Sequence, residues 1–264
     1  MAHPDMRRNR LLEILGKKRF HGIGELKRAT GTAHATIYRD LNALEKEGKI
    51  RKSHGGVEVL PEKAAVREYD KRLRINADLK TAIARAALNY VSPGDHIFLD
   101  ASSTCCFLGL AIMKGNLEGV TIVTNSIHLL AEYQQCDSVV KLISTGGSVD
   151  RELCAFLGNF TTDFISRVHV AKTFVSSAGW NVRDGISTTS DFILGALKAA
   201  VAAAPKRYCL VDSAKFGHEY LFKVAGLDEF ESVITDNGLE KAVVRKIKAA
   251  GIPLVTAESG EKTG

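Results

Sequence analysis

Residues 32–48 read TAHATIYRDLNALEKEG, and this stretch decides the fold of the N-terminal region. Ile37, Leu41 and Leu44 recur at the spacing i, i+4 and i+7, which places them on one face of a helix. The opposite face carries side chains that can reach phosphate groups or base edges: His34, Thr36, Tyr38, Arg39, Asn42 and Lys46. The stretch therefore predicts an amphipathic helix with a polar outer face, ended at Gly48.

Residues 49–59, KIRKSHGGVEV, follow this helix and predict a two-stranded hairpin. Its turn falls at residues 54–56, because adjacent glycines tolerate the positive φ angles that a tight turn requires. A polar-faced helix with a basic hairpin beside it is the layout of a winged helix-turn-helix. We therefore expect double-stranded DNA to be held by side chains of the helix and the wing: His34, Thr36, Tyr38, Arg39, Asn42, Lys52, His54 and Gly55.

The residues upstream support this prediction. Amphipathic patterns at 11–15 and 23–29 predict two shorter helices, and residues 30–32 form a Gly-containing connection to the third. Three helices with such a turn before the last are typical of a helix-turn-helix. The alternative is a solvated basic helix packed on some other core. The charge distribution favours DNA binding, because residues 1–60 hold 13 Lys and Arg against 7 Asp and Glu, whereas residues 61–264 hold 23 of each.

Length and composition limit the remaining possibilities. A chain of 264 residues can form one small and one large domain, each with its own core. The chain has no apolar run of about 20 residues that could cross a bilayer, and no apolar segment behind the N-terminal arginines that could act as a signal peptide. The five cysteines include no C-x-x-C pair and no His at zinc spacing. We therefore expect a cytoplasmic protein with reduced thiols, no metal and no cofactor.

Beyond Pro61 the sequence predicts a charged connector over 61–76 and then an α/β domain over 77–264, after a DNA-binding domain over 1–60. Short apolar runs predict strands at 96–99, 120–123, 139–143, 172–175, 207–211 and 232–235, with an edge strand at 253–255. Between and around them lie helix patterns at 78–91, 104–113, 126–135, 160–166, 191–204 and 238–249. Continuous apolar strands that alternate with helices predict a mostly parallel sheet covered on both faces.

Polar residues follow each predicted strand, and in a parallel sheet these strand ends meet at one edge, where ligands bind. Hydroxyls and backbone amides at a helix N-terminus favour an anion. Ser102, Ser103 and Thr104 suit a phosphate, Lys198 or Lys215 could supply the positive charge, and Asp100 and Asp212 could accept from sugar hydroxyls. Further candidates at the same edge are Thr124, Asn125, Gly146 and Gly147. For any one loop, the alternative is that the hydroxyl only caps a helix.

These motifs together resemble the DeoR family of bacterial transcription regulators over nearly the full chain. The family pattern T-I-R-R-D-L-N-x-L-E reads TIYRDLNALE at 36–45, and its H-G-G is found at 54–56. Its effector-domain motifs appear as DASSTC at 100–105, TNS at 124–126, GG at 146–147, DSAKFG at 212–217 and ITD at 234–236. The resemblance implies a fold similar to ribose-phosphate isomerase and CoA-transferase domains, a phosphorylated sugar or polyol effector, and repression of a catabolic operon.

This chain departs from the family pattern at several positions. Tyr38 replaces the first of two arginines, which removes one positive charge from the expected DNA-binding face. Ser102 stands at a glycine position and Cys105 at a threonine position of the phosphate loop. The acidic residues usual before Lys198 are absent.

Two classes of function follow. The first is an effector-controlled DNA-binding regulator, which we expect to be a homo-oligomer, a dimer or tetramer, because paired domains on paired half-sites gain avidity. The second is a sugar-phosphate isomerase or transferase with an accessory DNA-binding domain. Its base would have to be Asp100, Asp212 or Asp236. We favour the regulator and expect no catalytic residue.

Overall fold

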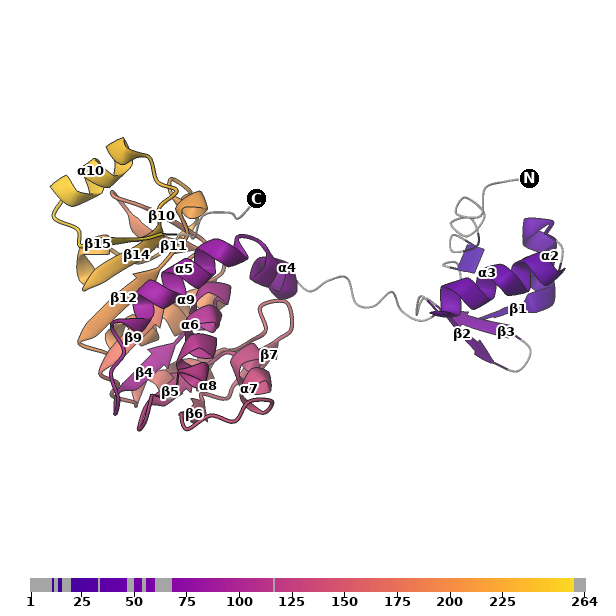
Figure 1. Ribbon diagram of the computed structural model, residues 1–264, viewed down its shortest axis with the longest axis horizontal. Coiled ribbons are helices and arrows are strands. Elements are labelled where there is room, and N and C mark those ends of the chain that lie inside the picture. Colours follow the sequence, from indigo (N-terminus) through magenta and orange to yellow (C-terminus); the bar gives the residue numbers. More distant parts are fainter. Residues whose placement is uncertain are drawn as a thin grey trace. The chain divides into compact units, whose positions relative to one another are not determined.

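The computed structural model describes residues 11, 14–15, 20–32, 34–46, 50–53, 56–59, 68–115 and 117–258. The chain forms two compact units, Met1–Arg67 and Glu68–Gly264 (Figure 1).

The first unit contains the second and third expected helices and the hairpin; the first helix, expected over 11–15, is described only at residues 11, 14 and 15, which are helical. Helix α2 spans Ile23–Thr30 and α3 spans His34–Lys46, and Gly31 ends α2 in the left-handed conformation. Strands β2 (Ile50–Ser53) and β3 (Gly56–Val59) pair antiparallel, which confirms the predicted hairpin; its turn at His54 and Gly55 lies outside the described residues. A third strand, β1 (Phe20–Gly22), pairs with β3 and was not expected from the sequence.

Aliphatic side chains from all of these helices and from the hairpin form the core of the first unit. The predicted apolar stripe of α3 is confirmed, because Ile37, Leu41 and Leu44 are fully buried. They join a cluster whose other fully or almost fully buried members are Leu11, Leu15, Leu26, Ile50 and Val57. Burial of this stripe fixes which face of α3 is left outside.

The second unit is built on a seven-stranded parallel sheet, as predicted. Its strand order is β15-β14-β12-β9-β4-β5-β6. The strands span His96–Leu99 (β4), Thr121–Thr124 (β5), Lys141–Ser144 (β6), Lys172–Val175 (β9), Lys206–Leu210 (β12), Ser232–Asp236 (β14) and Leu254–Ala257 (β15). The last strand lies at the edge, where the sequence placed it.

Helices cover both faces of this sheet (Figure 1). One face packs against α5 (Ala77–Leu88), α6 (Ser103–Lys114) and α7 (Ile127–Tyr133), and the other against α8 (Asn159–Ser166), α9 (Asp191–Ala202) and α10 (Lys241–Ala249). Adjacent strand residues serve opposite faces: Ile97 and Leu99 belong to one core cluster and Phe98 to the other. Both faces of the strands are therefore buried, which explains the continuous apolar runs in the sequence.

The second unit also contains short elements that the sequence did not predict. Strands β7 (Ser148–Asp150) and β8 (Ala155–Leu157) pair antiparallel, and β10 (Gly179–Asn181), β11 (Gly185–Thr188) and β13 (Phe222–Ala225) form a separate antiparallel sheet. Two single-turn helices, η1 and η2, span Ser213–Lys215 and Leu227–Glu229. Trp180 of β10 is fully buried in the same core cluster as α9.

Of the connector expected over 61–76, residues 61–67 lie outside the described residues. Residues 68–76, which the sequence analysis assigned to a connector, include helix α4 (Glu68–Arg74) and lie within the second unit. The physical reason is Tyr69, which is fully buried, packs its ring 5.5 Å from that of His128 and donates its backbone N–H to Glu152 O. Helix α4 is therefore fixed to the second unit.

The glycine pair that follows β6 forms a structural corner. Gly146 and Gly147 both have positive φ angles, 63° and 122°, and Thr161 Oγ1 donates a hydrogen bond of 2.7 Å to Gly146 O. A methyl group added at Gly147 would overlap Thr161 Oγ1 and lie 2.9 Å from Leu157 O, whereas one at Gly146 meets no atom within 4 Å. Both glycines therefore adopt a backbone conformation that favours glycine, but only Gly146 has room for a side chain.

Within the described ranges, no helix is both long enough and apolar enough to span a membrane.

The different surroundings of Gly146 and Gly147 predict that alanine at the two positions lowers stability by unequal amounts. Gly146→Ala should lower the free energy of unfolding by about 1 kcal/mol, the cost of a positive φ for a residue with a side chain. Gly147→Ala should cost about 3 kcal/mol or more, because overpacking adds to that conformational cost. Denaturant unfolding followed by circular dichroism measures both variants. Equal losses would contradict the close contact with Thr161.

Candidate functional site

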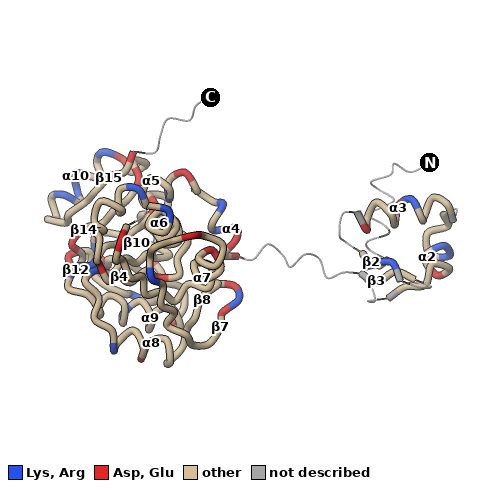
Figure 2. The backbone as a smooth tube through the Cα atoms, turned by 60° about the horizontal axis from the view of Figure 1, so that its bottom comes forward, with Lys and Arg blue, Asp and Glu red and all other residues tan. Residues whose placement is uncertain are grey.

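Helix α3 presents a polar face to solvent, opposite its buried stripe. Tyr38, Arg39 and Asn42 are exposed and Thr36 is partly exposed. Tyr38, Arg39 and Asn42 follow one another at helical i, i+1 and i+4 spacing, so they occupy one side of the helix. Figure 2 marks Lys and Arg residues on α2, α3 and β2 of this unit. The structure thus leaves these four predicted DNA-binding side chains accessible; nothing is described for the side chain of His34, or for His54 and Gly55.

The wing is tied to this helix through a lysine. Lys52 of β2 donates through Nζ to Asn42 Oδ1, and the same Nζ lies 2.8 Å from Glu45 Oε2. The backbone N–H of Lys52 donates to Glu45 Oε1 at 3.0 Å, and these contacts with Lys52 lower the pKa of Glu45. Asn42 and Lys52 therefore also position the hairpin against α3.

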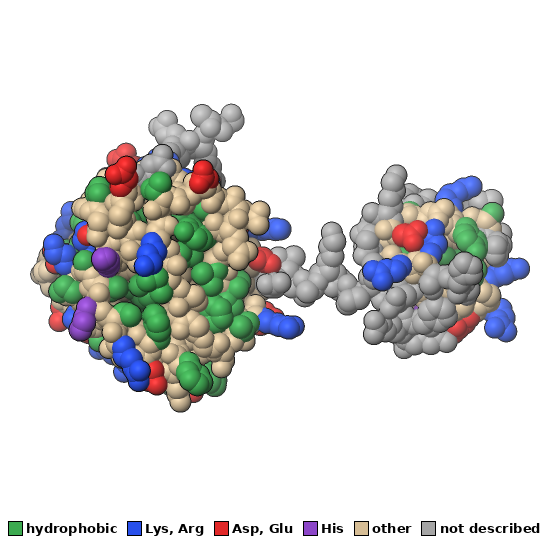
Figure 3. Space-filling model, turned by 90° about the horizontal axis from the view of Figure 1, so that it is seen from below, with side chains coloured by type: hydrophobic (Ala, Val, Ile, Leu, Met, Phe, Trp, Pro, Cys, Tyr) green, Lys and Arg blue, Asp and Glu red, His purple; other side chains and the backbone are tan. Residues whose placement is uncertain are grey.

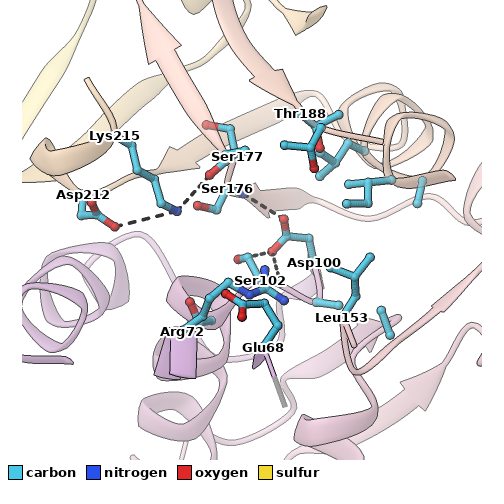
Figure 4. Close-up of a pocket in the computed structure, with 18 of the residues that line it drawn as sticks. Glu68, Arg72, Asp100, Ser102, Leu153, Ser176, Ser177, Thr188, Asp212 and Lys215 are labelled. Atoms are coloured by element: carbon cyan, nitrogen blue, oxygen red, sulfur yellow. Dashed lines mark hydrogen bonds and ion pairs between the residues drawn. The ribbon is translucent and has the colours of Figure 1, made fainter. Parts of the chain in front are cut away.

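The second unit contains a cavity of about 600 Å³ at the carboxyl ends of the parallel strands (Figure 4). It is lined by loops that follow β4, β5, β9 and β12, together with α4, α5, β8 and α9. This is the sheet edge at which the sequence predicted a ligand. Six of the predicted effector residues line it: Asp100, Ser102, Ser103, Asn125, Asp212 and Lys215.

Asp100 organises the loop after β4. Its Oδ1 accepts from Ser102 N at 3.0 Å and from Ser102 Oγ at 2.5 Å, and its Oδ2 accepts from Ser176 N at 2.9 Å. Ser102 Oγ in turn accepts from Cys105 N, so Ser102 is the N-cap of α6. The helix-cap alternative raised from the sequence thus holds for Ser102. In the first turn of α6, Cys105 N donates to Ser102 Oγ and Cys106 N donates to Ser102 O, and Ser103 lines the cavity.

Lys80 is a buried cation in the wall of the cavity. Its side chain is 3% exposed, and its Nζ donates to Arg72 O and, at 2.5 Å, to Ile75 O, which are carbonyls at the end of α4. Burial and the positive charge of Lys215, partly offset by Asp212, lower the pKa of Lys80 to about 8. An anion in the cavity would remove part of this penalty.

Arg72 of α4 is a second cation that lines the cavity. Its guanidinium lies 5.2 Å from the centre of the Tyr69 ring, and its Nε and Nη2 are buried with no hydrogen-bond acceptor in the described part of the chain. Neither Arg72 nor Lys80 forms an ion pair with a carboxylate among the described residues. Glu68, which also lines the cavity, pairs instead with Lys71 at 3.5 Å.

Lys215 and Asp212 lie together on the loop after β12. Lys215 Nζ donates to Ser177 O at 2.9 Å and lies 3.8 Å from Asp212 Oδ2 (Figure 4). Trp180 Nε1 donates to Asp212 O, which fixes the backbone of this loop. Asp212 Oδ1 has no partner in the described chain.

The cavity walls hold a set of buried polar atoms without hydrogen-bond partners among the described residues. Donors and acceptors are both present: Arg72 Nε and Nη2, Ser176 Oγ, Ser177 Oγ, Asn125 Oδ1 and Asp212 Oδ1. Buried polar groups are nearly always hydrogen-bonded in folded proteins, so a cluster of this kind indicates the place of a polar ligand. Together with the cations Arg72, Lys80 and Lys215, these atoms suit an anion that also carries hydrogen-bonding groups.

Five of the predicted effector residues do not line the cavity. Thr124 is buried and donates its Oγ1 to Leu99 O, and Thr104 is buried within α6. Gly146 and Gly147 form the structural corner described above. Lys198 is exposed on α9, because that helix turns Ala196 and Leu197 toward the cavity. The positive charges at the cavity come from Lys215, as expected, and from Arg72 and Lys80.

Sequence reasoning missed both of these cations. Lys80 carried a usable signal, because it lies three residues before Ile83 in the apolar stripe of its helix, and a lysine inside such a stripe must find polar partners. Arg72 carried none, because it lies in a run of charged residues that reads equally well as a solvated connector.

The cysteines and carboxylates offer little for catalysis or metal binding. Burial raises the pKa of the Cys105 thiol, which donates to Phe174 O and lies outside the cavity lining. Asp236 is fully buried and accepts from Ser213 N, Ser213 Oγ and Gly238 N. In the parts of the chain with described coordinates, no three His, Cys, Asp or Glu residues gather as a metal site.

Comparison with known proteins gives the same division into two parts. A family model described as the DeoR-like helix-turn-helix domain matches residues 7–63, and one described as the DeoR C terminal sensor domain matches residues 75–237. The uncharacterized HTH-type transcriptional regulator YulB of Bacillus subtilis is 31% identical over 94% of this chain and 96% of its own. The L-fucose operon activator of Haemophilus influenzae is 28% identical over 87% of this chain and 90% of its own.

Among solved structures, ribose 5-phosphate isomerase A from Neisseria gonorrhoeae matches with a TM-score of 0.37 and 18% identity over 52% of each chain. This distant likeness carries no argument about activity. The family models and the full-length relatives do: the chain belongs to the DeoR family of HTH-type transcriptional regulators.

Proposed function

We propose that this DeoR-family regulator represses a sugar or polyol catabolic operon and is controlled by a phosphorylated sugar or polyol bound in the cavity of the second unit. The observation that carries the proposal is the cluster of Arg72, Lys80 and Lys215 with the unpartnered hydroxyls of Ser176 and Ser177. A phosphate group supplies both negative charge and several acceptors, which suits such a set of donors.

Helix α4 offers a physical route from the effector to the DNA-binding unit. Arg72 lines the cavity, and α4 is the first described element after the first unit along the chain. Lys80 ties the carboxyl end of α4 to α5, so an anion that engages both cations changes the forces on α4 directly. For regulation, the effector must prefer one placement of α4 over another, because equal affinity for both shifts nothing.

The DNA is held, in this proposal, by Thr36, Tyr38 and Arg39 of α3 and by the wing around His54. Asn42 and Lys52 contribute by fixing the wing to α3, as their mutual hydrogen bond indicates.

Oligomerisation and the sign of control complete the proposal. Phe160 of α8 and Phe192 of α9 are 81% and 66% exposed on neighbouring helices, and Figure 3 shows hydrophobic side chains gathered on one face of the second unit. Exposed apolar surface of this kind supports a dimer or tetramer. Repression in the cytoplasm is what the family resemblance implies, although one relative is named an operon activator. Transcription from the same DNA with and without the protein would measure the sign of control.

The competing function, a sugar-phosphate isomerase or transferase, receives less support. Of its three possible bases, Asp100 and Asp236 already accept hydrogen bonds on both oxygens, which leaves only Asp212 with a free oxygen. We infer a binding site without turnover. Loss of a sugar phosphate over time in the presence of the protein would support the enzyme instead.

A gel shift on the DNA upstream of this protein's own gene tests the proposal, with and without a pool of sugar and polyol phosphates. We expect a specific shift that the phosphorylated pool alters and the unphosphorylated sugars do not. A specific shift that ignores the pool would contradict the phosphorylated effector.

Two substitutions should distinguish the DNA-binding function of the first unit from the effector-binding function of the second. Arg39→Ala should weaken DNA binding and reduce its salt dependence, by about one phosphate contact, while leaving effector binding intact. Lys215→Ala should weaken effector binding and leave the affinity for DNA unchanged in the absence of effector. If Lys215→Ala lowered that affinity as strongly as Arg39→Ala does, the proposed division of labour would be wrong.

Anion binding should weaken as the pH rises through about 8, because Lys80 is charged below its pKa and neutral above it. Sulfate is a suitable probe, since its own charge is constant over this range. Its dissociation constant, obtained from sulfate-dependent thermal stabilisation, should rise at least about threefold between pH 7 and pH 9. Lys80→Met should bind sulfate weakly at both pH values; a pH dependence retained in that variant would assign the titration to another group.

A further inference from the structure

The cavity has a charged end and an aliphatic end. Its charged residues come from α4, α5 and the loops after β4 and β12. The residues that line it from β8, the turn before β8 and α9 are all aliphatic: Leu153, Ala155, Leu157, Ile193, Ala196 and Leu197. In Figure 4, Leu153 lies on the opposite side of the cavity from Asp212 and Lys215.

This aliphatic wall follows from the local structure of the two elements. Ile193, Ala196 and Leu197 are spaced i, i+3 and i+4 on α9, so one face of the helix carries all three. Ala155 and Leu157 alternate with Phe156 along β8 and therefore share one face of that strand. Leu153 and Ile193 are only partly buried by the protein itself, which leaves part of their surface to a ligand.

The wall offers few partners to a hydroxyl group. Thr188 and Thr189, which lead from β11 toward α9, line the cavity, and so does Tyr220, whose backbone N–H donates to Ser187 Oγ of β11. A ligand hydroxyl that is buried against the wall without a partner loses its hydrogen bonds to water, whereas a C–H surface gains from leaving water. A ligand with a hydroxyl on every carbon is therefore a poor fit at this end.

We propose that the effector is a phosphomonoester whose end remote from the phosphate is apolar, and that Leu153, Ile193 and Leu197 select it against fully hydroxylated sugar phosphates. This inference rests on the proposed function, because it places the phosphate at Arg72, Lys80 and Lys215. The effector then has its hydroxyls close to the phosphate, within reach of Ser176, Ser177 and Asn125.

A pair of probes of equal length tests the selection directly. 2-Hydroxybutyl phosphate, called butyl phosphate in the rest of this test, and erythritol 4-phosphate each have four carbons, one phosphate and a hydroxyl beside the phosphate-bearing carbon. They differ only in the two hydroxyls remote from the phosphate. Isothermal titration of the full-length protein should give butyl phosphate a dissociation constant at least about tenfold lower than that of erythritol 4-phosphate.

Variants on the two sides of α9 assign the preference to the wall. Ile193→Thr and Leu197→Asn should each reduce the preference for butyl phosphate to less than about threefold, since each adds a hydrogen-bonding group to the wall. Lys198→Asn changes an exposed residue of the same helix that does not line the cavity, and it should keep the wild-type preference. Thermal unfolding without ligand identifies a variant that fails to fold, and Ile193→Thr is the conservative change that keeps the test available.

The possible failures are distinguishable. If erythritol 4-phosphate binds as tightly as butyl phosphate or more tightly, the apolar selection is wrong and the phosphate site stands. If butyl phosphate binds no more tightly than 1-butanol, the phosphate site itself is wrong, and the inference falls with it. If Lys198→Asn loses the preference together with Leu197→Asn, the preference does not arise from the cavity wall.

Discussion

The sensor site depends on the hydrogen bonds of one buried ammonium group, that of Lys80. It donates to two carbonyls at the end of α4 and so joins α4 to α5. The same group is close enough to Lys215 for their positive charges to oppose one another, and burial adds to this cost. A protein that keeps such cations together beside unpartnered donors has lowered the cost of binding an anion, since the ligand relieves a penalty already present.

The parallel sheet supplies the geometry in which this charge can act. Its strand ends bring Asp100, Ser176 and Lys215 to one edge, and hydrogen bonds between these loops fix the cavity wall. Helix α4 adds Arg72 from a segment that leads back along the chain to the DNA-binding unit. The matches to the helix-turn-helix domain and to the sensor domain thus fall in separate units. In the proposed mechanism, α4 is the element of the second unit through which an effector acts on the first.

Sequence patterns predicted the elements that have strong periodicity. The buried stripe of α3 and the seven strands of the parallel sheet follow from apolar spacing alone. Strands of three residues, such as β7 and β10, carry too few side chains for a pattern. The polar residues that follow the strands identified Asp212 and Lys215. Lys198 was also expected at the cavity, but it is exposed, because the packing of α9 sets the direction of its side chain and the sequence pattern does not reveal that packing. Lys80 and Arg72 were missed because they reach the cavity from helices that precede the sheet.

In the proposed mechanism, an anion held by Arg72 controls DNA binding. Fluorescence anisotropy with the DNA upstream of the gene would measure the affinity of the wild-type protein and of Arg72→Gln, each with and without the sugar and polyol phosphate pool. The account predicts equal affinities without the pool and a response to the pool in the wild type alone. An Arg72→Gln variant that responds to the pool as the wild type does would contradict it.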